Sequence, residues 1–221
     1  MISRANLTRG RSTWGDDLNC FHVTGDSAEI LTHAWNGVRF FTLNRPKTIN
    51  SLTHSMVTTM HSLLRDWADD DDVHAVVVRG AGERGLCAGG DVVAIYHSIR
   101  TDGGSETRQF WHDEYVLNHF IARYPKPYIA LMDGIVMGGG VGISVHAGTR
   151  VVTDTSKLAM PEVGIGLVPD VGGTYYLSRA RRIKTDLDTG CPQLPNTSNK
   201  LDKLIKYTSQ ASFCSRKEDE E

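Results

Sequence analysis

The sequence has no long apolar run and no excess of charge of either sign. No stretch approaches the ~20 apolar residues that a membrane-spanning helix needs, so we expect no membrane partner. With 24 basic and 26 acidic residues, the formal net charge is -2. Such a balance excludes the broad basic field typical of nucleic-acid-binding proteins, and no nucleic-acid partner is expected. Any anionic ligand must therefore be bound by local groups.

Motifs for disulfides, metals and nucleotides are missing as well. Cys20, Cys87, Cys191 and Cys214 form no CxxC pair, and 221 residues can bury a core without disulfides, which predicts reduced thiols. The nine histidines show no HxH or HxxxH spacing, so no metal site is expected. No Gly-Lys-Ser or Gly-Lys-Thr occurs, which excludes a P-loop. Residues 80–85 match GxGxxG only formally, because no helix is expected to begin within that motif.

Composition divides the chain into three parts. Residues 1–28 are interpreted as a flexible N-terminal extension without the apolar centre of a secretory signal, so we expect a cytoplasmic protein. The alternative is a mitochondrial protein, because the arginines before Asp16 also fit a transit peptide. Residues 29–180 form the expected core. Residues 181–221 turn to Pro, Asn, Ser and Thr and then to charge, which predicts a divergent and poorly ordered tail.

The periodicity of the core predicts strands that alternate with helices. Residues 29–43 form a hairpin in this interpretation, because Asn36-Gly37 tolerates the positive φ angles of a tight turn. Thr53 is the expected N-cap of a helix with one apolar face, which ends at an acidic run. A buried strand at residues 75–78 follows. A helix at 106–123 and a strand at 128–132 repeat the pattern, and this alternation indicates an α/β fold.

Two glycine-rich loops stand out. Residues 87–91 (CAGGD) and 137–142 (MGGGVG) each follow an expected strand and lead into an expected helix. Glycine lets backbone N–H groups approach a ligand closely, and a helix start leaves such donors unpaired. Two donors from separate loops suit an oxyanion hole, which stabilises charge on a carbonyl oxygen. The alternative is that the glycines only permit tight turns.

Glu162 and Asp170 form the third feature. They lie eight residues apart in a loop rich in Val, Ile, Leu, Pro and Gly. Burial raises the pKa of a carboxyl group, and two neighbouring carboxylates separate their pKa values, so one acts as base or nucleophile while the other keeps its proton. The alternative is a pair of solvated loop acids. The apolar neighbours favour the functional interpretation.

Six ordered motifs carry a resemblance to a known family: residues 43–47, 85–91, 111–115, 124–128, 134–142 and 161–173. Over residues 29–179 the chain resembles the crotonase (enoyl-CoA hydratase/isomerase) superfamily, and within it the 3-hydroxyisobutyryl-CoA hydrolases. This resemblance implies a spiral of ββα units, incomplete at its C-terminal end. It implies an acyl-CoA substrate, with coenzyme A as part of that substrate and no separate cofactor. The resemblance leaves open whether the protein forms a homo-oligomer.

The resemblance also implies roles for individual residues. The backbone N–H groups of Gly90 and Gly139 would form the oxyanion hole, Glu162 and Asp170 would be the acting carboxylates, and Glu114 would line the acyl pocket. Lys47 is a candidate contact for the CoA phosphates, as are Arg45 and Arg84.

The choice of activity turns on two positions. Hydratases of this superfamily carry a second glutamate where this chain has Gly142, and usually a glycine where it has Asp170. The resemblance therefore favours hydrolysis of a short branched 3-hydroxyacyl-CoA thioester, as in valine catabolism. An enoyl-CoA hydratase or isomerase is the first alternative. A truncated relative that binds CoA without catalysis is the second.

Overall fold

The computed structural model describes residues 28–179 of the chain. The expected N-terminal extension, up to residue 27, and the expected tail lie outside the described residues. The strands are β1 (Ile30–Trp35), β2 (Val38–Leu43), β3 (Ala75–Gly80), β4 (Gly85–Cys87), β5 (Tyr128–Met132), β6 (Ile135–Met137), β7 (Thr149–Val152) and β8 (Lys157–Ala159). The helices are η1 (Pro46–Thr48), α1 (His54–Ala68), α2 (Val92–Asp102), α3 (Ser105–Ala122), α4 (Gly139–Val145), η2 (Glu162–Ile165) and α5 (Gly173–Arg179). In the described part of the chain, no helix has the length and apolarity to cross a membrane.

The strands form two sheets that share one repeating plan. The larger sheet has the order β1-β2-β3-β5-β7 and the smaller one the order β4-β6-β8. Each successive pair, β3 with β4, β5 with β6 and β7 with β8, gives one strand to each sheet and is followed by helical structure. All neighbours in the smaller sheet are parallel. This is the spiral of ββα units that the resemblance implies, and the α/β expectation is confirmed.

The local predictions for the first elements are confirmed in detail. β1 and β2 pair antiparallel, with Trp35 opposite Val38. The turn between them has positive φ at Asn36 (43°) and Gly37 (77°), as an Asn-Gly hairpin turn requires. The hydroxyl of Thr53 caps α1 by accepting a hydrogen bond from the N–H of Met56 at 3.1 Å.

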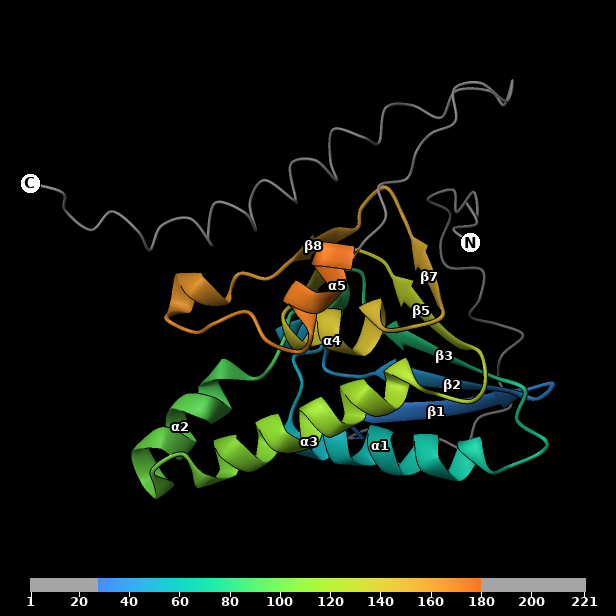
Figure 1. Ribbon diagram of the computed structural model, residues 1–221, viewed down its shortest axis with the longest axis horizontal. Helices are drawn as coiled ribbons and strands as arrows, with labels where there is room; N and C mark the ends of the chain where they lie inside the picture. The colour runs from blue at the N-terminus through green and yellow to red at the C-terminus, as the bar shows by residue number, and fades with distance from the viewer. Residues whose placement is uncertain (1–27, 180–221) are drawn as a thin grey trace, which may run out of the picture.

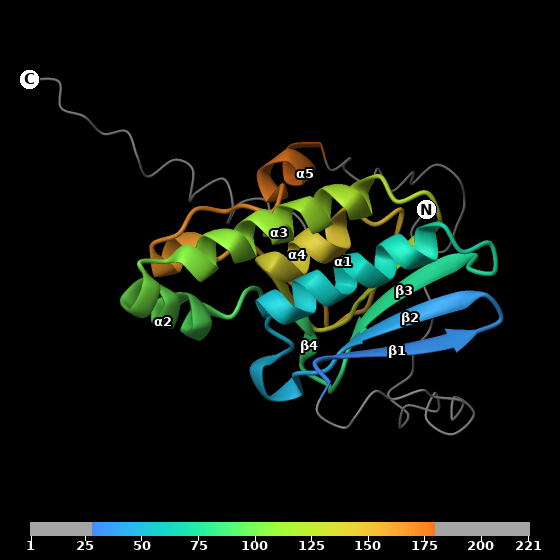
Figure 2. The same ribbon diagram turned by 90° about the horizontal axis from the view of Figure 1, so that it is seen from below.

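The core lies between the larger sheet and the helices. α1 buries its apolar face, and α1 and α3 run side by side across the sheet (Figures 1 and 2). α4 lies at the centre with every residue buried. Its glycines allow close contact with β4, since a Cβ built on Gly140 would lie 2.8 Å from the Cβ of Cys87. α4 therefore fixes the distance between the two glycine-rich loops.

Candidate active site

The two glycine-rich loops meet at one edge of the smaller sheet. The first follows β4 and the second follows β6, and these strands are parallel neighbours, so both loops leave the sheet at the same edge. Gly89 has a φ of 110°, and a Cβ built on it would lie 3.3 Å from the carbonyl oxygen of Met137 and 3.6 Å from the backbone nitrogen of Gly139. The structure thus brings the predicted loops into contact.

The local hydrogen bonds leave the N–H groups of Gly90 and Gly139 for another acceptor. Leu52 N–H donates to Gly89 O at 2.8 Å, and Asp91 N–H donates to Leu52 O at 2.9 Å. In a parallel bridge, this pattern turns the N–H of the residue between the two, here Gly90, away from the partner. Gly139 is the first residue of α4, where an N–H group has no acceptor within the helix. Their service as an oxyanion hole stays a prediction.

Glu114 and Glu162 lie directly against the second loop. Glu114 comes from α3 and is 2% exposed, and a Cβ on Gly139 would collide with its Oε1. Glu162 begins η2 and is 8% exposed, and a Cβ on Gly138 would lie 2.8 Å from its Oε1. The glycines are required at these two positions because carboxylates occupy the space of a side chain.

Asp170 completes a cluster of three carboxyl groups. Its Oδ2 accepts a hydrogen bond from the hydroxyl of Tyr115 at 2.7 Å. Burial, together with the negative charges of Asp170 and Glu162, raises the pKa of Glu114 to about 8. Burial, and then Asp170, also raises the pKa of Glu162. At neutral pH Glu114 therefore keeps its proton, and a buried neutral acid in such a cluster suits acid–base chemistry.

Two buried oxygens of this cluster lack a partner among the described residues. They are Oε1 of Glu114 and Oε2 of Glu162. Buried polar atoms in proteins are normally hydrogen-bonded, so unpaired ones at the same place indicate a site that is completed by a ligand or water. The residues that the sequence predicted separately thus converge here.

The reason expected for the burial of Glu162 is wrong. Its apolar loop neighbours are exposed, with Val163 at 51%, Ile165 at 59% and Val168 at 77%. Glu162 is buried instead because it turns inward onto Gly138, the N-cap of α4, while Val163, Ile165 and Val168 are exposed. Asp170 is only half-buried.

One of the candidate phosphate contacts, Arg45, is engaged in local bonds near the first loop. Arg45 donates to the carbonyl oxygen of Ser51 at 2.7 Å and forms ion pairs with Glu29 at 3.1 Å and Asp91 at 2.8 Å. Asp91 is the N-cap of α2, so Arg45 holds the first loop in place rather than remaining free for a phosphate. Lys47 is exposed in η1, and its contact with CoA stays a prediction.

Asn118 is the residue that sequence reasoning missed. A Cβ built on Gly142 would lie 2.7 Å from the Cβ of Val171 and 2.8 Å from Nδ2 of Asn118. Asn118, from α3, and Val171 therefore occupy the space that a side chain at Gly142 would need. A usable signal was the spacing from Glu114, because residues four apart share one face of a helix.

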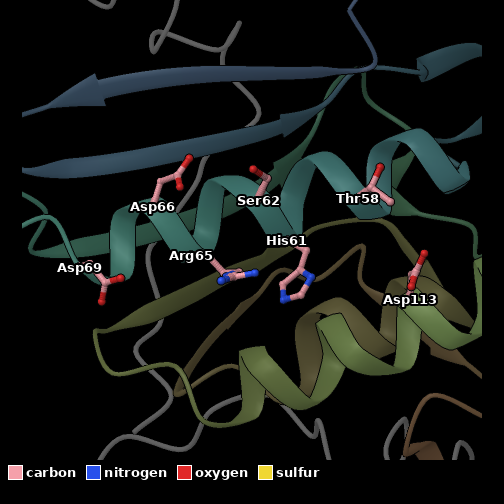
Figure 3. A pocket seen from close by; sticks show the side chains of 7 residues that line it. All are labelled: Thr58, His61, Ser62, Arg65, Asp66, Asp69 and Asp113. Carbon is pink, nitrogen blue, oxygen red and sulfur yellow. The ribbon is translucent and has the colours of Figure 1, made fainter.

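Two cavities are lined in part by residues of α3. One, of about 780 Å³, is lined by Tyr115, Asn118, Asp170 and residues of α5. The other, of about 410 Å³, lies between α1 and α3 and is lined by polar and charged side chains, among them Arg65 and Asp113 (Figure 3). The second cavity contains none of the predicted site residues. The first adjoins the carboxyl cluster and is the candidate substrate pocket.

Comparison with known proteins gives a consistent picture. Residues 38–186 match the model of a family described as enoyl-CoA hydratase/isomerase. The chain is 46% identical over 152 residues to the mitochondrial 3-hydroxyisobutyryl-CoA hydrolase of Danio rerio, covering 69% of this chain and 40% of that protein. It is 45% identical over 179 residues to the enzyme of the same name from Mus musculus, covering 81% of this chain and 46% of that protein. The chain thus spans less than half the length of these curated relatives.

Solved structures of acyl-CoA hydratases and dehydratases are similar to this chain as well. A carnitinyl-CoA dehydratase from Mycobacterium thermoresistibile has a TM-score of 0.67 and 67% identity, over 69% of this chain and 44% of that one. An enoyl-CoA hydratase from Rhodobacter sphaeroides 2.4.1 has a TM-score of 0.67 and 42% identity, over 69% of this chain and 45% of that one. The family match covers well over half of the chain, and the fold agrees with it. The chain belongs to the enoyl-CoA hydratase/isomerase (crotonase) family.

Proposed function

We propose that the chain carries a site for the hydrolysis of 3-hydroxyisobutyryl-CoA or a similar short branched 3-hydroxyacyl-CoA thioester. The observation that carries the proposal is the packing of Glu114 and Glu162 against the second glycine-rich loop, with Asp170 close enough to raise the pKa of Glu114. The names of the curated relatives in zebrafish and mouse favour this substrate. A role in valine catabolism follows from that substrate and is part of the same proposal.

In the proposed reaction, Gly90 and Gly139 donate their N–H groups to the thioester carbonyl oxygen and stabilise the negative charge that develops on it. Glu162 either attacks the carbonyl carbon or removes a proton from the attacking water. If Glu162 attacks, the C–S bond breaks first and water then hydrolyses the resulting anhydride; if Glu162 acts as base, water adds to the thioester carbonyl and the C–S bond breaks as the adduct collapses. In both routes one proton of the water passes by way of Glu162 to the departing thiolate, so the carboxylic acid and the CoA thiol are released. Asp170, oriented by Tyr115, positions the reacting groups at the departing thiolate.

The second candidate is hydration or dehydration of an enoyl-CoA. The solved structures that carry hydratase and dehydratase names favour it. The packing around Gly142 argues against hydration, because a side chain at this position would collide with Val171 and Asn118. This packing disfavours a second acid–base glutamate on α4, and hydrolysis is the better-supported reaction.

Thiol release from 3-hydroxyisobutyryl-CoA tests the proposal directly, with loss of crotonyl-CoA absorbance measured in parallel. Asp170→Asn separates the two candidates: it should abolish thiol release but leave hydration of crotonyl-CoA intact. Asp66→Asn is the matched control, since it removes an exposed carboxylate that lines the other cavity. A folded parent protein that hydrates crotonyl-CoA without releasing thiol would overturn the proposal. Binding of CoA esters without either reaction would favour a non-catalytic role.

We also propose a mitochondrial location in place of the cytoplasmic expectation. The names of the relatives include that compartment, in line with the alternative interpretation of the arginines before Asp16. Fractionation of the source cells, followed by sequencing of the mature N-terminus, tests it. Recovery of an uncleaved protein in the cytosol would contradict it.

A further inference from the structure

Asn118 has a side chain that the described structure buries without satisfying. The residue is 5% exposed, and neither its Nδ2 nor its Oδ1 has a hydrogen-bond partner among the described residues. An unpaired buried amide destabilises a fold, because it has lost its hydrogen bonds to water without gaining others. An amide with both groups unpaired therefore indicates a place where a ligand atom or a water completes the bonds.

The position of this amide connects the carboxyl cluster to the larger cavity. Asn118 lies one helical turn after Glu114 on α3, so both side chains leave the same face of the helix. It lines the cavity of about 780 Å³ together with Asp170, a member of the carboxyl cluster, and Tyr115, which donates a hydrogen bond to Asp170. A ligand group bound at Asn118 is therefore next to the carboxyl cluster but takes no part in its acid–base chemistry.

Packing fixes the amide at this point. Its Nδ2 lies 2.8 Å, and its Oδ1 3.0 Å, from the position that a Cβ of Gly142 would take. Since Gly142 has no side chain and α4 is buried throughout, the amide fits against the helix backbone. A buried side chain held in this way offers one donor group and one acceptor group in a fixed direction.

We propose that the Asn118 amide is a subsite for a hydroxyl group on the acyl chain of the thioester. A hydroxyl both donates and accepts, and the amide provides the partner for each. The amide is neutral, so it adds no charge to the carboxyl cluster. A bound water offers the same chemistry, and substrates with and without the hydroxyl distinguish the two sources. The inference rests on the proposed thioester hydrolysis and names the part of the site that selects the acyl group.

The test compares thiol release from 3-hydroxyisobutyryl-CoA with release from isobutyryl-CoA, which lacks only the hydroxyl. The parent should favour the hydroxy ester by roughly 10- to 100-fold in kcat/KM, because a site built for a hydroxyl is left with unpaired groups by the analogue. Asn118→Leu, of similar size, should reduce this preference to within about threefold, mainly by loss on the hydroxy ester. Equal rates with both esters in the parent would overturn the proposal without any variant.

Thr107→Val is the matched control. Thr107 also lies on α3, is buried, and has an unpaired Oγ1, but it does not line the cavity. The control should keep the preference of the parent, and loss of preference in both variants would indicate a general effect on α3 and contradict the subsite.

Failure of the reaction and failure of the subsite are distinguishable. If the folded parent releases thiol from neither ester, the proposed function fails, and the rise in Tm with each ester then decides the subsite. A larger rise with the hydroxy ester that Asn118→Leu removes supports the subsite. Equal rises overturn it.

Discussion

At neutral pH, Glu114 is held as a buried neutral acid, and its removal should change how stability depends on pH. Burial first, and then the charges of Asp170 and Glu162, together raise its pKa from 4.5 to about 8. Below pH 4.5, Glu114 is protonated in both the folded and the unfolded chain. As the pH rises further, the unfolded chain ionises first. The stability that the neutral acid provides is therefore present at low pH and is lost as the pH rises through about 8.

The size of the effect follows from the shift. Each pKa unit corresponds to about 1.4 kcal/mol, so the free energy of unfolding should fall by roughly 3 kcal/mol between pH 5 and pH 8 because of Glu114 alone. Glu114→Gln keeps the side chain neutral in both states and removes this contribution. The stability difference, variant minus parent, should accordingly rise by about the same amount over this range.

Urea unfolding of both proteins at pH 5, 6, 7 and 8 measures the difference. Glu106→Gln is the matched control, because it removes an exposed glutamate from the first turn of the same helix. The difference in unfolding free energy between Glu106→Gln and the parent should not show the pH dependence expected for Glu114→Gln. If the Glu114→Gln difference changes by less than about 1 kcal/mol from pH 5 to pH 8, the carboxyl group is not held neutral and the acid–base reasoning fails.

Three further substitutions test other parts of the site. Glu162→Gln keeps the size of the side chain but removes the base, and thiol release should fall by roughly 100-fold or more; a change within about threefold would show that another group acts. Tyr115→Phe removes the hydrogen bond to Asp170, and kcat should fall by roughly 10-fold while KM stays near the parent value; an unchanged kcat would contradict its positioning role. Gly142→Ala places a methyl group 2.7 Å from the Cβ of Val171, and urea unfolding should show a loss of about 1 to 3 kcal/mol; a neutral result would mean that Val171 and Asn118 move aside easily.

Local elements of the fold were predictable because their signals lie within a few residues. The Asn36-Gly37 turn and the cap of α1 by Thr53 need only short-range geometry. The division into two sheets was not predictable from periodicity. β4, β6 and β8 have three residues each, too few to show a pattern, and only the resemblance indicated a spiral.

The site was predictable as a set of residues and less so as a geometry. The resemblance indicated Glu114, Glu162 and Asp170, and the structure brings them together. The burial of Glu162 depends on its contact with Gly138, which is distant in sequence, and the apolar residues beside Glu162 in its own loop do not cause it. The roles of Arg45 and Asn118 likewise depend on partners from other elements, which no local pattern contains.

The smaller sheet has a consequence for folding. Its three strands each end at a different part of the site: β4 at the first glycine loop, β6 at the second and β8 before Glu162. No single ββα unit contains a usable site, and the site exists only after the third unit has docked on the second. Ligand binding and completion of the stack are therefore thermodynamically linked, so a bound ester opposes the detachment of any one unit.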